Sequence, residues 1–247
     1  TDLVSYWELE EASGTRVDSH GSNDLTDATT TASGTGIIGD GADFTSDYLT
    51  LSLGSTGLEL DTTFSVAFWM KADSVAGYDG IYMSGTQSNL WRIGISSGTP
   101  KLTFTEENVA DSKGATTLTT GTWYHCVIVK DGDAGTNLTI YLNGSSDGTA
   151  SVGTLTTPTG TARIGSYINN GLFFDGIIDE FGIWSRALSA ADVTSLYNSG
   201  AGLPYEVAAP TNTYSLTVNA SKVAATLTDY PAYVDLADMP ASFWAGV

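Results

Sequence analysis

The chain is poor in positive charge, in cysteine and in long apolar runs. Its 9 lysine and arginine residues stand against 28 acidic ones, which gives a net charge of -19 at neutral pH. Because phosphate groups would be repelled, nucleic acid and anionic membranes are disfavoured as partners. The single cysteine, Cys126, cannot form an internal disulfide. No run of about 18 apolar residues occurs, so neither a transmembrane helix nor membrane insertion is expected.

Residue patterns that carry common catalytic chemistry are also missing. The two histidines, His20 and His125, come from distant segments without a Cys/His cluster, which disfavours a zinc site. A retaining glycosidase built on a strand would show a Glu-x-Asp-x-Glu pattern, which is absent. Asp179 and Glu180 are adjacent, so we expect them on opposite faces of a strand. The sequence therefore favours a protein that is not an enzyme.

Short alternating segments dominate what is present. Phe64, Val66, Phe68 and Met70 share one face of a predicted strand, and Asn143-Gly144 is a strong hairpin turn. With 28 glycines and many Ser and Thr residues, the chain predicts roughly twelve short strands joined by tight turns. The predicted fold class is all-β, with antiparallel strands in two facing sheets that bury the aromatic faces.

One short helix and a separate tail complete the predicted organisation. Ser189 is an N-cap candidate with Asp192 three residues on, which predicts a short helix near the end of the main domain. We expect that domain to span residues 1–203. Residues 204–213 are predicted to be a linker, and residues 214–247 a partial second β domain or a docking tail.

Landmark motifs follow one another in order along residues 3–203: Tyr6-Trp7, then residues 39–44, 64–69, 123–125, 138–144 and 176–189. In this order they resemble a laminin-G-like, concanavalin-A-like lectin domain of the pentraxin type. The resemblance implies a jelly-roll sandwich, closed where the segment near residue 180 lies beside the first strand. It also implies a binding or adhesion module. The tail resembles the opening of a bacterial or phage β-sandwich domain, which implies an extracellular, cell-surface or virion-surface protein.

The resemblance further implies one structural Ca²⁺ ion. Asp18 and Asn23 from the first loop would bind it together with Asp179 from the closing strand. A carboxylate within the apolar strand around Asp179 needs a partner, and a cation or backbone N–H groups could serve. The alternative is a hydrogen-bonded tie between loop and strand without metal. His20 departs from the family pattern at a position that usually holds Asp or Asn.

Aromatic residues divide into core and candidate ligand-binding positions. Tryptophans within apolar strands are expected in the core. Aromatics in predicted loops or at strand ends could stack on sugar rings; these are Tyr78, Tyr82, Trp91, Tyr167 and Phe173. Three functions stay open: a glycan-binding module, a structural module of a phage tail, fibre or capsid decoration that contacts a neighbouring protein subunit, and a glycoside hydrolase. A homo-oligomer or a larger assembly is compatible with the first two.

Overall fold

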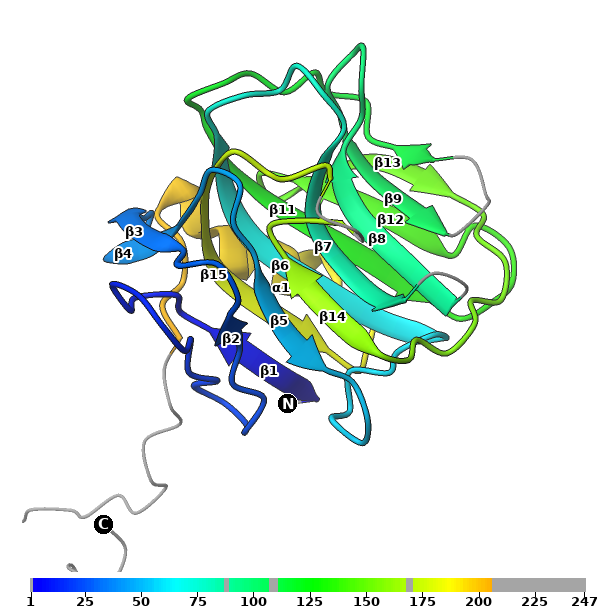
Figure 1. Cartoon of the computed structure of the whole chain (residues 1–247). Helices are drawn as coiled ribbons and strands as arrows, with labels where there is room; N and C mark the ends of the chain where they lie inside the picture. Colours follow the sequence, from blue (N-terminus) through cyan, green and yellow to red (C-terminus); the bar gives the residue numbers. More distant parts are fainter. Residues whose placement is uncertain (1, 87–88, 107–110, 168–170, 206–247) are drawn as a thin grey trace, which may run out of the picture. The chain divides into compact units, whose positions relative to one another are not determined.

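The computed structural model describes residues 2–86, 89–106, 111–167 and 171–205. These residues form two facing β-sheets and one short helix (Figure 1). The chain divides into two compact units, residues 1–205 and 206–247. Beyond Tyr205, the predicted linker and the predicted partial β domain lie outside the described residues and stay predictions.

One sheet, which we call the back sheet, has eight strands. Their spatial order is β13 (Ser145–Ala150), β12 (Leu138–Leu142), β11 (Trp123–Asp131), β6 (Thr63–Ala72), β15 (Gly176–Trp184), β4 (Asp40–Phe44) and β3 (Ala32–Thr35), with β1 (Leu3–Trp7) paired to β15. The predicted turn at Asn143-Gly144 joins β12 to β13, and both residues have positive φ, 51° and 79°. That conformation suits Asn followed by Gly in a two-residue hairpin.

The other sheet, which we call the front sheet, faces the viewer in Figure 1. Its seven strands are ordered β10 (Ser112–Lys113), β9 (Leu102–Glu106), β8 (Asn89–Ile95), β7 (Asp79–Thr86), β14 (Thr161–Ile164), β5 (Leu49–Ser52) and β2 (Thr26–Asp27). Neighbouring strands of both sheets pair antiparallel. The predicted all-β sandwich of two antiparallel sheets is confirmed.

Aromatic rings from the two sheets meet in the core. Phe64 of β6 stacks on Trp91 of β8, with ring centroids 4.5 Å apart. Phe68 stacks on Phe181 at 5.3 Å, and the Tyr82 ring lies 5.4 Å from Phe181. Period-two alternation places these large rings between the sheets, where burial of apolar area stabilises the fold. The predicted common face of Phe64, Phe68 and their neighbours on β6 is confirmed.

Strand β15 closes the sandwich. It pairs with β6 along one side, and along the other with β4 up to Ile178 and with β1 from Phe181 onward. The change of partner falls at a bulge, where Glu180 has a φ of 52° and the register to β6 shifts. The predicted neighbourhood of the first strand and the segment near residue 180 is therefore confirmed.

Helix α1 (Ala190–Tyr197) follows β15. The Ser189 side chain accepts the N–H of Asp192, and the Asp192 carboxylate accepts the N–H of Ser189, so the predicted capping box is confirmed. The helix ends where Asn198 adopts a left-handed conformation, and the short 3-10 turn η2 (Asn198–Gly200) follows. Among the described residues, no helix is long and apolar enough to cross a membrane.

The helix covers the outer face of the back sheet. Val193 of α1 is buried with Val127, Trp184 and Tyr6, which project from that face. Figure 1 shows α1 behind the back sheet, on the side away from the front sheet. The described residues place no helix on the outer face of the front sheet.

Removing a central ring tests this core. Phe181 is fully buried and contacts Phe68, Tyr82 and Trp7. We expect Phe181→Ala to lower the free energy of unfolding by about 3–5 kcal/mol, because it leaves a cavity. Urea denaturation measures the loss. The exposed Val17 is the control, and Val17→Ala should change stability by less than about 0.5 kcal/mol. Equal effects of the two changes would contradict this core.

Candidate functional site

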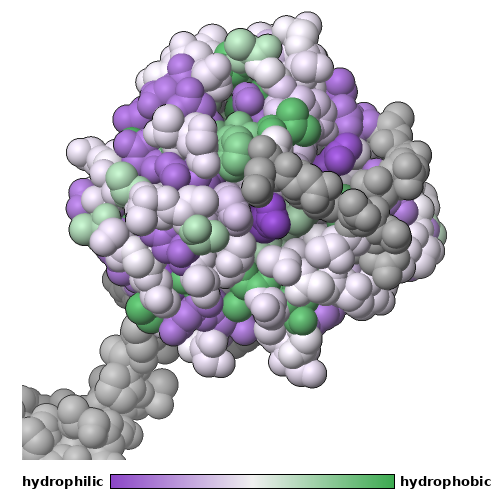
Figure 2. Space-filling model, viewed as in Figure 1, coloured by the Kyte–Doolittle hydropathy of each residue, from purple (hydrophilic) through white to green (hydrophobic). Residues whose placement is uncertain are grey.

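The outer face of the front sheet carries a group of aromatic and basic side chains, which we call the front-face cluster. Its members are Tyr48, Tyr78, Met83, Leu90, Arg92, Arg163, Tyr167 and Phe173. Figure 2 views this side of the molecule, and apolar and strongly hydrophilic surface lie next to each other near its centre. Such a mixture suits a ligand with both apolar and polar groups.

Strand register brings the two arginines close to each other. Arg92 of β8 is paired with Met83 of β7, and Met83 is paired with Arg163 of β14. The row continues to Thr105 on one side and Thr50 on the other. Because neighbouring strands lie about 4.8 Å apart, the two arginine backbones are roughly 10 Å apart. Met83 lies between them and is buried with Leu90 and Tyr167.

Tyrosine rings hold each guanidinium in place. The Arg92 guanidinium carbon lies 4.9 Å from the Tyr167 ring centroid and 5.6 Å from that of Tyr78. The Arg163 guanidinium lies 4.7 Å from the Tyr48 ring, and its Nη1 donates to the Tyr167 carbonyl at 3.2 Å. Stacking of this kind stabilises a cation and fixes the plane of the guanidinium.

Acidic and hydroxyl groups frame the cluster. The Tyr78 hydroxyl donates to Asp111 at 3.2 Å, and Thr105 donates to the same carboxylate at 2.6 Å. Lys113 lies 3.5 Å from Asp111 and compensates its charge. Burial and the nearby Asp175 raise the pKa of Asp79 to about 6. Several buried polar atoms here have no partner among the described residues: Asp79 Oδ2, Arg92 Nε, Arg163 Nε and Ser166 Oγ.

Gly94 lets Tyr167 lie across β8. A Cβ atom at Gly94 would stand 2.5 Å from the Tyr167 hydroxyl and 2.4 Å from the Asp79 carbonyl oxygen. No real Cβ tolerates such distances, and a backbone carbonyl cannot move away easily. A residue without a side chain is therefore needed for the ring to reach its place beside Arg92.

The structure separates the five predicted stacking residues. Tyr78, Tyr167 and Phe173 come together in the front-face cluster, although Tyr167 is largely buried. Tyr82 and Trp91 are core side chains with 2% and 1% exposure. A sugar needs an exposed ring face, so the placement of these two at the surface is wrong. Tyr167, with 4% exposure, is also too buried to offer a ring face. A role of Tyr78 and Phe173 in ligand binding stays a prediction.

The alternation of side chains between the two faces of a strand explains why Trp91 and Tyr82 are buried. Trp91 is in phase with Ile93 and Ile95, which point into the core. Tyr82 turns inward because a register shift between Gly80 and Tyr82 interrupts β7. The same alternation places Arg92 on the outer face, and the sequence analysis missed it. The apolar period of β8 was the signal that could have found it.

The first loop holds Asp18 through hydrogen bonds. Its carboxylate accepts the backbone N–H groups of Tyr6, His20, Gly21 and Asn23 at 2.9–3.1 Å. Burial acts against the charged form, but these N–H groups hold the pKa of Asp18 below its usual range. N–H groups aimed at the oxygens occupy the positions that a cation would need.

Asn23 and Asp179 are engaged elsewhere. The Asn23 side chain donates to Ser5 Oγ at 2.8 Å and to the Thr56 carbonyl at 3.0 Å. Asp179 Oδ2 accepts the N–H groups of Ile37 at 2.7 Å and Ile38 at 3.1 Å. In the described part of the chain, no three acidic, His or Cys side chains group closely enough to hold an ion. These residues, as placed, do not fit the implied Ca²⁺ ligand set, and the ion stays a prediction.

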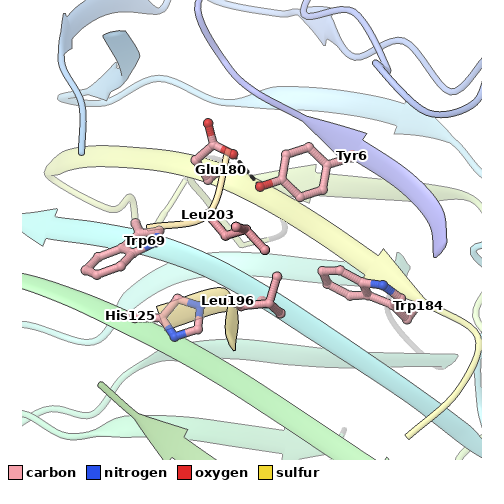
Figure 3. A pocket seen from close by; sticks show the side chains of 8 residues that line it. Tyr6, Trp69, His125, Glu180, Trp184, Leu196 and Leu203 are labelled. Carbon is pink, nitrogen blue, oxygen red and sulfur yellow. Dashed lines mark hydrogen bonds between the residues drawn. The ribbon is translucent and has the colours of Figure 1, made fainter. Parts of the chain in front are cut away.

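A second polar group lies on the opposite side, at the outer face of the back sheet. The Tyr6 hydroxyl donates to Glu180, and Figure 3 shows the two side chains pointing toward each other. The adjoining cavity measures about 10 Å³ and is lined also by His125 and Leu203. That volume holds about one water molecule, so a sugar cannot enter. Burial lowers the pKa of His125 to about 4, which keeps the ring neutral.

Two adjacent buried carboxyl groups thus hold their protons tightly. Burial raises the pKa of Asp179 to about 7. Burial, with the Asp179 and glutamate charges nearby, raises the pKa of Glu180 to about 8. The folded chain binds these protons more tightly than the unfolded chain does. The free energy of unfolding therefore falls as the pH rises from the ordinary carboxyl pKa values of 3.8 and 4.5 to the raised values of about 7 and 8.

Comparison with known families gives one match. A laminin G model, described as the concanavalin A-like lectin/glucanases superfamily, matches residues 40–194. A comparison with curated proteins finds no match.

Several solved structures share the fold. Domain 4 of AbnA, an extracellular GH43 arabinanase from Geobacillus stearothermophilus, solved in complex with arabinotriose, is 20% identical with a TM-score of 0.63. The match covers 78% of this chain and 97% of that domain. The botulinum neurotoxin serotype G binding domain is 17% identical with a TM-score of 0.60, over 79% of this chain and 50% of that one. Trypanosoma rangeli sialidase is 10% identical with a TM-score of 0.59, over 81% and 33%. These likenesses show a shared fold.

A substitution at Asp18 tests whether hydrogen bonds or a Ca²⁺ ion hold the first loop in place. Asp18→Asn replaces one acceptor oxygen by an NH₂ group, so a buried N–H loses its partner. We expect a loss of about 1–3 kcal/mol in unfolding free energy, with or without Ca²⁺. Calorimetric titration of the chelated wild type with Ca²⁺ should give no heat and no change in Tm. A Ca²⁺-dependent rise in Tm that Asp18→Asn removes would contradict the hydrogen-bonded tie and support the ion.

The raised pKa of Glu180 yields a test in pH. Glu180→Gln can still accept the hydrogen bond from Tyr6 but cannot ionise. We expect its Tm to lie closest to the wild type below about pH 4.5, to exceed it increasingly as the pH rises, and to keep a constant lead above about pH 8, because only the wild type must ionise a buried group. Scanning calorimetry across pH measures this. The exposed Asp73 provides the matched control variant, Asp73→Asn, measured in the same way. A constant difference at all pH values would refute the buried titration.

Proposed function

Because this chain belongs to the concanavalin A-like lectin/glucanases superfamily, we propose that it is a non-enzymatic module that binds glycans through the outer face of its front sheet. One observation carries the proposal: this face is left open by the helix and holds four aromatic rings together with two arginines. We place the module on an extracellular, cell-surface or virion-surface protein.

The chemistry of the front-face cluster supports a sugar ligand. Sugar rings present apolar C–H faces that pack on aromatic rings, and hydroxyl groups that accept and donate hydrogen bonds. Tyr48 and Phe173 are half-buried neighbours with centroids 6.4 Å apart. Arg92, Arg163 and Ser166 each hold a buried polar atom without a partner in the described residues. The half-buried Tyr48 and Phe173 rings lie with the partly exposed Arg92 and Arg163, and such a mixture suits a glycan site.

Known structures of the same fold add support. Domain 4 of the arabinanase AbnA was solved with arabinotriose bound, and the neurotoxin fragment is a binding domain. Both are different proteins at low identity. They support the choice of a binding module, and of a saccharide as the first ligand to try.

The placement of the carboxylates supports a non-enzymatic role over a glycoside hydrolase. A retaining glycosidase needs two carboxyl groups about 5–5.5 Å apart in an open groove. Asp179 and Glu180 are both buried, at the side of the molecule that α1 and residues 201–205 cover. The Glu180 carboxyl group also accepts a hydrogen bond from the Tyr6 hydroxyl group.

A glycan array tests the proposal. The full chain, labelled at its terminus, should bind a defined set of saccharides. Tyr48→Ala and Phe173→Ala should each weaken that binding about tenfold, because each removes a ring worth about 1 kcal/mol or more in stacking. Surface titration of the best saccharide measures the change.

Tyr141 provides the matched control. It is a half-buried tyrosine on the outer face of the back sheet, and Tyr141→Ala should leave binding unchanged. If no saccharide on a broad array binds, the glycan proposal is wrong, and a structural module that contacts a neighbouring protein subunit is favoured. Equal losses in all three variants would place the site elsewhere.

A further inference from the structure

We propose that Arg92 binds the carboxylate of an acidic sugar, so that the ligand of the front-face cluster is a saccharide carrying uronic or sialic acid residues. This inference rests on the proposed glycan-binding function and specifies its ligand class.

Arg92 has a charge that nothing in the described chain compensates. The protein carries 28 acidic residues and 9 basic ones, so an arginine has many acids available to it. The ion pairs of the described residues involve Arg16, Lys113, Lys130 and Arg186. The Arg92 side chain makes no ion pair and no hydrogen bond within this part of the chain, and its Nε is buried without a partner. The Arg92 residue is partly exposed, so an external anion can approach its guanidinium and compensate the charge.

The rings prepare Arg92 for such a ligand. Tyr167 and Tyr78 contact the guanidinium at 4.9 and 5.6 Å, measured to the ring centroids. The two ring centroids are only 5.6 Å apart, so both rings lie toward one side of the guanidinium and leave its opposite side without a ring from this pair. A planar carboxylate can then accept two parallel hydrogen bonds from the guanidinium N–H groups. Lysine could supply the charge but not this geometry.

Arg163 supports the same site from two strands away. Its guanidinium lies over Tyr48, and Nη1 is already bonded to the Tyr167 carbonyl. It therefore acts as a positioning residue, which fixes Tyr167 beside Arg92. Its charge also offsets the repulsion that a net charge of -19 exerts on an approaching anion.

Nearby acids do not occupy the Arg92 donors. Asp111 accepts from Tyr78 and Thr105 and is paired with Lys113. Asp79 is buried, and neither of its oxygens is within ion-pair distance of Arg92. Hydroxyl oxygens of a neutral sugar can accept hydrogen bonds from the guanidinium, but only a carboxylate also neutralises its charge and pairs with it through two charge-assisted hydrogen bonds. The cluster therefore selects for an acidic saccharide.

The experiment compares ligands that differ in one charge. The full chain is titrated with an oligogalacturonate and with its methyl ester, and with a sialylated oligosaccharide and its methyl ester, alongside sulfated and neutral saccharides. We expect at least one free acid to bind about tenfold or more tightly than its ester. Arg92→Gln should remove that preference while it leaves the weak binding of the ester unchanged. Arg92→Lys should retain only part of it, because the paired hydrogen bonds are lost.

Lys101→Gln is the matched control. It removes the same single charge just before β9, away from Arg92, and should keep the preference for the acid. Equal binding of acid and ester, or binding of sulfated saccharides alone, would overturn the inference while the glycan proposal stands. Binding of no saccharide at all would overturn both. An unchanged Tm of Arg92→Gln shows that the fold is intact.

Discussion

Strand β15 is held by three other strands, and the rest of the structure depends on this position. It pairs with β6, β4 and β1, and its bulge falls where β4 gives way to β1. At that point Asp179 accepts two N–H groups from the loop before β4, and Glu180 accepts the Tyr6 hydroxyl of β1. Two buried acids thus hold the start of the chain against its closing strand.

This closure decides which face can bind. The chain leaves β15 at the back, so α1 and the residues up to Tyr205 cover the back sheet. Tyr205 stacks on Tyr6 at 4.9 Å and bonds His20 of the first loop at 3.0 Å. The front sheet stays uncovered by any helix of the described residues, and its outward rows become the available surface.

Much of the fold could be predicted from the sequence, because alternation, turn residues and caps act locally. The strand through Phe64, the hairpin at Asn143-Gly144 and the cap at Ser189 are confirmed, as is the family. The site was harder, because it depends on register between strands far apart in sequence. Arg92 and Arg163 come close to each other because each is paired with Met83, on the strand between them. Its residue type suggested Trp91 as a stacking residue, but the alternation along β8 directs its side chain into the core.

The central claim is that the outer face of the front sheet is the binding face. A crystal structure of the chain with its best-bound oligosaccharide tests this most directly. The account predicts saccharide density at the outer surface of the front sheet, beside the partly exposed Tyr48, Tyr78 and Phe173, with an anionic group at the Arg92 guanidinium. Density at the back sheet, under α1 or beside Glu180, would contradict it.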